Sequence, residues 1–168
     1  MGQMDKNMDK ILELFFEFPD QKFTIRSIAK TTGIPKSSVQ NYLQKFKSAG
    51  LVADGNKASN TKFFKIKKIN YFIEKLYASG LIGHLNEFFA PSCIILFGSF
   101  RKGDSVKDSD IDIFVETIKK IGANLSNFEK KLNHRIQLFK ETDINKLPPK
   151  LLNNVINGIK LEGFFKIK

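Results

Sequence analysis

Residues 96–115 read LFGSFRKGDSVKDSDIDIFV, and this stretch decides the fold. The apolar run CIILF stands before Gly98 and predicts a buried strand. The segment SDIDIFVE predicts a second strand, yet it carries Asp110 and Asp112. Residues two apart in a strand point to the same face, about 7 Å apart along the chain. Two such carboxylates repel each other and are costly to desolvate, so a ligand is expected beside them.

A divalent cation would remove this cost. Mg²⁺ (or Mn²⁺) takes oxygen ligands and keeps positions free for phosphate oxygens. Gly98 lets a phosphate approach the backbone, while the Ser99 hydroxyl and neighbouring N–H groups can bind it. Arg101 and Lys102 follow within reach of a triphosphate. The pattern predicts a site for a metal-bound nucleotide, and the alternative is a coincidental Asp-x-Asp in a turn.

The two motifs together resemble those of a known superfamily. An apolar-Gly-Ser pattern at 97–99, a spacer, and an acid-apolar-acid-apolar pattern at 110–113 are similar to the DNA-polymerase-beta-like nucleotidyltransferases in their minimal form. The resemblance covers about residues 88–165. It implies that Asp110 and Asp112 are catalytic residues that hold the Mg²⁺ of a nucleoside triphosphate. It also implies transfer of a nucleoside monophosphate to an acceptor hydroxyl.

One position departs from the family pattern. The family has a third carboxylate on a later strand, and here that strand, HRIQLF, carries Gln137. Gln keeps one carbonyl oxygen and loses the charge, so Gln137 is a weak or lost metal ligand. Glu116 and Glu141 are expected to lie too far along their strands to replace it. Nucleotide binding through Asp110 and Asp112 could survive this loss.

Three functions therefore stay open. The first is an enzyme that transfers a nucleoside monophosphate to a protein or nucleic-acid acceptor; the resemblance permits a partner toxin as the acceptor. The second is a transcriptional regulator whose nucleotidyltransferase fold is catalytically degenerate. The third is an assembly module that binds neither DNA nor nucleotide. Restoring Asp at position 137 distinguishes the first two.

Positive charge is concentrated in the first half of the chain. Residues 21–68 carry eleven Lys and Arg and one acid, a net charge of +10 out of +11 for all 168 residues. Such a local field suggests a polyanion-binding surface. A solvated charged face is the alternative, but it does not explain the near absence of acids between the basic residues.

Ala29, Gly33 and Val39 have the A-x3-G-x5-V spacing of a helix-turn-helix, with small residues at the helix contact and turn. Residues 51–66, LVADGNKASNTKFFKI, predict two short strands joined by a polar loop. The region resembles the winged-helix DNA-binding superfamily over about residues 5–68, and the resemblance implies a wing from Asp54 to Lys62. The expected contacts with double-stranded DNA are polar or basic: Lys36, Ser37, Ser38, Gln40, Asn41, Gln44, Lys45, Lys57 and Lys62. A winged helix that serves only as a packing or protein–protein module is the alternative.

The expected fold class is α+β, an N-terminal winged helix followed by a mixed-sheet nucleotidyltransferase domain. Expected boundaries are 1–68 for the winged helix, 69–90 for a linker helix with a weak point at Gly80 and Gly83, and 91–168 for the second domain. A homodimer contact is expected on apolar linker residues: Tyr71, Phe72, Leu76, Tyr77, Leu81 and Ile82.

The cellular setting is inferred from composition. The single cysteine, Cys93, allows no disulfide within the chain, and it is expected to be a small apolar residue in a strand. No run of about 18 apolar residues occurs. We therefore expect a cytoplasmic protein with no membrane partner.

Overall fold

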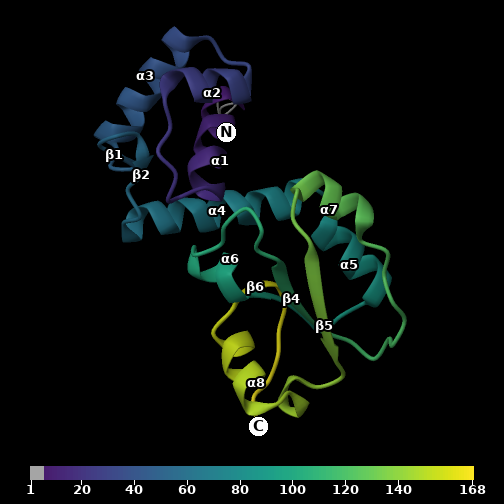
Figure 1. Cartoon of the computed structure of the whole chain (residues 1–168). Helices are drawn as coiled ribbons and strands as arrows, with labels where there is room; N and C mark the ends of the chain where they lie inside the picture. Colours follow the sequence, from purple (N-terminus) through teal and green to yellow (C-terminus); the bar gives the residue numbers. More distant parts are fainter. Residues whose placement is uncertain (1–5) are drawn as a thin grey trace. The chain divides into compact units, whose positions relative to one another are not determined.

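The computed structural model describes residues 6–168. The chain divides into two compact units between Lys68 and Ile69 (Figure 1). Helix α4, Lys62–Ala78, runs across this division, and the residues expected to form a linker belong to its second half and to α5, Leu81–Phe89. The break between these helices lies at Gly80, whose φ is +84°, whereas Gly83 lies inside α5.

The first unit consists of three helices and a small antiparallel hairpin. Its elements are α1 Lys6–Glu17, α2 Ile25–Thr32, α3 Lys36–Ser48, β1 Val52–Ala53 and β2 Lys57–Ala58. The three helices pack through apolar side chains that are fully buried: Ile11, Phe15, Ile28 and Val39. These positions follow the helical spacing of the sequence, so burial of one face of each helix stabilises the unit.

The turn between α2 and α3 is explained by its local sequence. Thr24 accepts from the N–H of Ser27, and the Ser27 side chain completes a capping box at the start of α2. Helix α2 ends at Gly33, where φ is +72° and the N–H is donated to the carbonyl of Ala29. The capping box and Gly33 therefore explain the turn of the chain between α2 and α3.

The hairpin is shorter than the sequence pattern predicts. The residues TKFFKI were expected to form its second strand, but they start helix α4 instead. Thr61 provides the reason, since its side chain accepts from the N–H of Phe64 and its carbonyl accepts from the N–H of Lys65. Phe64 is buried, and its ring lies 5.2 Å from that of Phe16.

The second unit is built on a four-stranded mixed sheet of order β5-β4-β3-β6 (Figure 1). Strands β4 and β5 are parallel, and the other pairs are antiparallel. The elements after α5 are, in chain order, β3 Cys93–Phe97, α6 Gly98–Lys102, β4 Ile111–Glu116, α7 Ser126–Leu132, β5 Ile136–Glu141, the 3-10 turn η1 Ile144–Lys146, α8 Pro149–Ile156 and β6 Ile159–Gly163.

Both faces of this sheet are covered. On one face Phe97 and Phe114 form a buried cluster with Val155 of α8. Strand alternation places Ile113 and its β5 partner Leu138 on the opposite face, beside α7. The sheet is therefore a central layer, and only the ends of its strands remain for a site.

The expected dimer surface is mostly inside the chain. Phe72, Leu76, Leu81 and Ile82 are at most 3% exposed. Phe72 packs edge-on against Phe100, with ring centres 4.8 Å apart. These four side chains serve the chain's own core and are not available to a second copy, so this part of the expectation is wrong. The helical spacing of these apolar residues predicted that they would be buried. It did not predict that they would be buried within the chain and not against a second copy.

Candidate functional site

The site begins at the turn from β3 into α6. Gly98 has φ +71°, a conformation that L side chains rarely adopt. A Cβ added at Gly98 would overlap Oδ2 of Asp112 and lie 2.9 Å from its Cγ. The absent side chain at Gly98 therefore leaves the space in which the Asp112 carboxylate lies. The Gly-Ser motif and the acid motif, which the loop after α6 separates in the sequence, meet at this point.

The strand register explains how Asp112 is placed. Asp112 stands opposite Phe97 on β3 and beside Gln137 on β5. It is partly buried, and burial raises the pKa of its carboxyl above the ordinary value of 3.8, with a further contribution from the charge of Asp110. Asp110 is exposed one residue before β4. The expected pair of interacting carboxylates is therefore present.

These two carboxylates are chemically suited to a cation. Within residues 6–168, no hydrogen bond or ion pair satisfies the side chain of Asp110 or Asp112. A partly buried, unpaired carboxylate beside a second one is costly. Hard oxygen donors next to the space at Gly98 fit a divalent cation such as Mg²⁺, and the charge of the ion would lower the cost.

Gln137, where the resemblance leads us to expect a third carboxylate, lies on β5. Its pairing with Asp112 in neighbouring parallel strands places both side chains on the same face. The Gln137 side chain is exposed. In the described part of the chain, no three His, Cys, Asp or Glu side chains gather in a way that could hold a metal ion. The structure thus supplies two carboxylates, Asp110 and Asp112, and the amide of Gln137 as oxygen donors on neighbouring strands.

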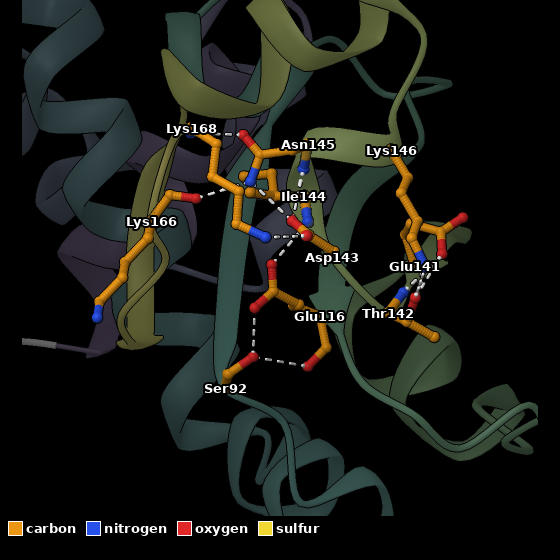
Figure 2. A network of polar contacts seen from close by, with 10 residues as sticks. All are labelled: Ser92, Glu116, Glu141, Thr142, Asp143, Ile144, Asn145, Lys146, Lys166 and Lys168. Atoms are coloured by element: carbon orange, nitrogen blue, oxygen red, sulfur yellow. Dashed lines mark hydrogen bonds and ion pairs between the residues drawn. The ribbon is translucent and has the colours of Figure 1, made fainter.

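Glu116 and Glu141 are engaged at the other end of the strands, as expected (Figure 2). Glu116 accepts from the Ser92 hydroxyl at 2.6 Å and from the N–H of Ile144 at 2.7 Å. Glu141 accepts from the N–H of Thr142 at 2.7 Å. Both carboxylates therefore hold the polar network drawn in Figure 2, and neither replaces a ligand at position 137.

The expected phosphate-binding residues lie on the short helix α6. Ser99 and Arg101 are half-buried, and Lys102 is exposed. Within residues 6–168, no hydrogen bond or ion pair joins the Arg101 or Lys102 side chain to another residue. Both cations follow Gly98 within one helical turn, so they are available to an anionic ligand at the end of β3.

The residues on the other side of Asp110 belong to no motif of the sequence. A hollow there is lined by three basic residues, Lys107, Lys130 and Arg135. Three acidic residues line it as well: Asp108, Asp110 and Glu129. His134 also lines it. Contacts between distant segments create this hollow, so no local motif could have revealed it.

The expected DNA-contacting residues lie on α3, apart from Lys57 on β2 and Lys62 at the start of α4. Most of them are exposed: Lys36, Ser37, Gln40, Asn41, Gln44, Lys45 and Lys62. Ser38 and Lys57 are half-buried, and the Lys57 ammonium lies 3.2 Å from a carboxylate oxygen of Asp20. Tyr42 is half-buried beneath the Lys45 ammonium, which lies 5.8 Å from its ring centre.

Comparison with known proteins identifies the second unit. Residues 80–162 match the family described as polymerase beta, nucleotidyltransferase. This part of the chain is a nucleotidyltransferase domain of that family, and the match contains Gly98, Asp110, Asp112 and Gln137. No curated protein and no solved structure gave a significant match.

The match does not extend to the first unit, whose structure is a set of helices with a small hairpin. The winged-helix interpretation therefore rests on the local pattern alone and remains a prediction. Within residues 6–168, no helix has both the length and the apolar character needed to cross a membrane.

Proposed function

We propose that the second unit binds a nucleoside triphosphate with Mg²⁺ at Asp110 and Asp112 and transfers its nucleoside monophosphate to an acceptor hydroxyl. One observation carries the proposal: the unpaired Asp112 carboxylate lies against Gly98, so the two family motifs form one site. The acceptor is a protein, such as a partner toxin, or a nucleic acid.

The residues have distinct roles in this proposal. Asp110 and Asp112 hold the metal, which neutralises charge on the phosphate oxygens when bound. Gly98 and Ser99 admit the phosphates to the backbone, while Arg101 and Lys102 supply positive charge. The reaction joins the acceptor oxygen to the α-phosphorus and releases pyrophosphate. Gln137 offers an uncharged oxygen next to Asp112, in the register position paired with it on β5.

The test uses α-labelled nucleoside triphosphates with Mg²⁺ or Mn²⁺, with and without cell extract. We expect label transfer by the native chain, loss of transfer in Asp110→Asn/Asp112→Asn, and retention in the control Asp108→Asn, which removes an exposed acid from the same loop. Gln137→Asp restores the third carboxylate and should change transfer little in an active site. Transfer by Gln137→Asp alone would refute an active native enzyme.

That last result would favour the alternative function, a regulator with a degenerate nucleotidyltransferase fold. Nucleotide binding would then be measured without catalysis. Binding of labelled nucleotide by the native chain and not by the double Asn variant would retain the site as a sensor. Absence of binding by both proteins would refute a nucleotide-binding role altogether.

We also propose that the first unit is a winged helix that binds double-stranded DNA through α3. The net charge of +10 over residues 21–68 supports this, as does the exposed polar face of α3. Affinity for a random 30-base-pair duplex should fall steeply with salt. Lys45→Gln should weaken binding, whereas Lys160→Gln on β6 should not. Equal effects of the two variants would argue against this surface.

The remaining expectations are proposals of the same kind. A DNA-binding winged helix acts as a homodimer when its site is palindromic. Since Phe72, Leu76, Leu81 and Ile82 are buried, any dimer must use other residues. Sedimentation of the native chain with and without duplex DNA would decide whether a dimer forms.

A further inference from the structure

Local hydrogen bonds hold the first part of the loop between α6 and β4, which carries Asp110 near its end. The N–H of Asp104 is donated to the carbonyl of Ser99 at 3.0 Å, which ties the loop to α6. Further on, Val106 and Ser109 exchange two bonds: the N–H of Val106 reaches the Ser109 hydroxyl at 2.9 Å, and the N–H of Ser109 reaches the carbonyl of Val106 at 2.9 Å. These bonds form a compact turn but do not fix its end at the strand.

The end of the loop is fixed by the segment before β5. Nδ1 of His134 lies 2.9 Å from the carbonyl oxygen of Ser109, the residue before Asp110. The N–H of Ile111, the residue after Asp110, is donated to the carbonyl of Arg135 at 2.8 Å. The peptides on both sides of Asp110 are therefore bonded to two consecutive residues of another segment.

The hydrogen bond of His134 has a defined direction. A carbonyl oxygen can only accept, so Nδ1 carries the proton and donates it. The ring that presents this proton is 6% exposed. It packs edge-on against Phe100 at 4.9 Å and against Phe72 at 5.7 Å, measured between ring centres. Aromatic packing therefore holds the donor in one orientation.

We infer that His134 is a positioning residue for the metal site, holding the backbone at Asp110 so that its carboxylate faces the same cation as Asp112. This rests on the proposed function of Asp110 and Asp112. Partners that orient a metal ligand typically change metal affinity about 10–100-fold when they are removed. His134 does not touch the ligand itself and acts through the Ser109 carbonyl.

Two substitutions separate the donor from the ring. His134→Asn places an amide N–H at the position of Nδ1 and removes most of the ring. His134→Phe keeps a ring between Phe72 and Phe100 and removes the donor. A positioning role predicts that the Asn variant binds metal better than the Phe variant. A role in core packing alone predicts the opposite order, because Phe replaces the buried ring and Asn does not.

The first measurement is Mn²⁺ affinity in the presence of a non-hydrolysable nucleoside triphosphate, from the electron paramagnetic resonance signal of free Mn²⁺. We expect binding about tenfold weaker for His134→Phe and within about threefold of native for His134→Asn. Native affinity in His134→Phe would overturn the inference alone. Failure of the native chain to bind Mn²⁺, or native affinity in Asp110→Asn/Asp112→Asn, would overturn the proposed function and the inference with it.

The second measurement reports the backbone without any metal. The amide of Ile111 should exchange with solvent about tenfold faster in His134→Phe than in the native chain, while core amides such as that of Ile94 keep their rates. Unchanged exchange at Ile111 would overturn the inference. The Phe variant keeps the buried ring and decides the question even where the Asn variant fails to fold.

Discussion

Gly98→Ala tests the contact on which the site depends. The new side chain has two costs. A non-glycine residue at φ +71° loses about 1–2 kcal/mol. The added Cβ also lies 2.9 Å from Cγ of Asp112 and overlaps its Oδ2, so the carboxylate must leave its rotamer at a cost of about 1 kcal/mol. We expect a loss of about 2–3 kcal/mol in the free energy of unfolding.

A matched control is available at Gly33, whose φ is +72° and where an added Cβ has nothing within 4 Å. Gly33→Ala therefore has the backbone cost alone. Urea unfolding followed by circular dichroism should show Gly98→Ala to be less stable than Gly33→Ala by about 1 kcal/mol. Nucleotide-dependent Mn²⁺ binding should weaken at least tenfold in Gly98→Ala only, because the displaced Asp112 carboxylate is a proposed ligand.

A double variant isolates the clash from the backbone cost. Asp112→Ala removes the carboxylate and leaves only a Cβ, 3.2 Å from the Cβ added at Gly98. Gly98→Ala should therefore cost about 1 kcal/mol less in the Asp112→Ala background than in the native one. Equal costs in both backgrounds, together with unchanged Mn²⁺ binding in the single variant, would refute the reasoning.

Three further predictions concern titration and reactivity. Burial raises the pKa of Asp112 from 3.8, so the contribution of this carboxyl to stability is full below pH 3.8 and is lost as pH rises through the folded-state pKa. Asp112→Asn should therefore raise the melting temperature at pH 7 and not at pH 3. A lower melting temperature of the variant at pH 7 would contradict this. Hydrogen bonds from Asn145, with the Lys168 ammonium, lower the pKa of Asp143 to about 2 (Figure 2); in Asn145→Ala, carboxyl NMR should show it rising toward 3.8, and a value still near 2 would refute the assignment. Burial raises the pKa of the Cys93 thiol to about 11, so Ellman's reagent should react with it only in urea, and rapid reaction of the folded chain would contradict this.

The architecture of the second unit was largely predictable, because it depends on local patterns. The apolar run before Gly98 and the alternation after Asp110 predicted two strands, and both are present as β3 and β4. Gly80 correctly marked the break between α4 and α5, whereas Gly83 lies inside α5. The prediction that residues 61–66 form the second strand of the hairpin was wrong. Phe64 has strand propensity, but the cap at Thr61 and the burial of the Phe64 ring favour a helix.

The sequence by itself determined which side chains bring chemistry to this chain: two acids on one strand face, a Gly-Ser turn before them, and Gln where the family has a third acid. Spacing within one strand is a covalent property, so it could be interpreted without a fold. Only the tertiary structure decided three facts. Gln137 stands beside Asp112, Glu116 accepts hydrogen bonds at the other end of the strands, and His134 is hydrogen-bonded to the loop of Asp110. These depend on strand register and on packing between segments far apart in the chain, which no local pattern specifies.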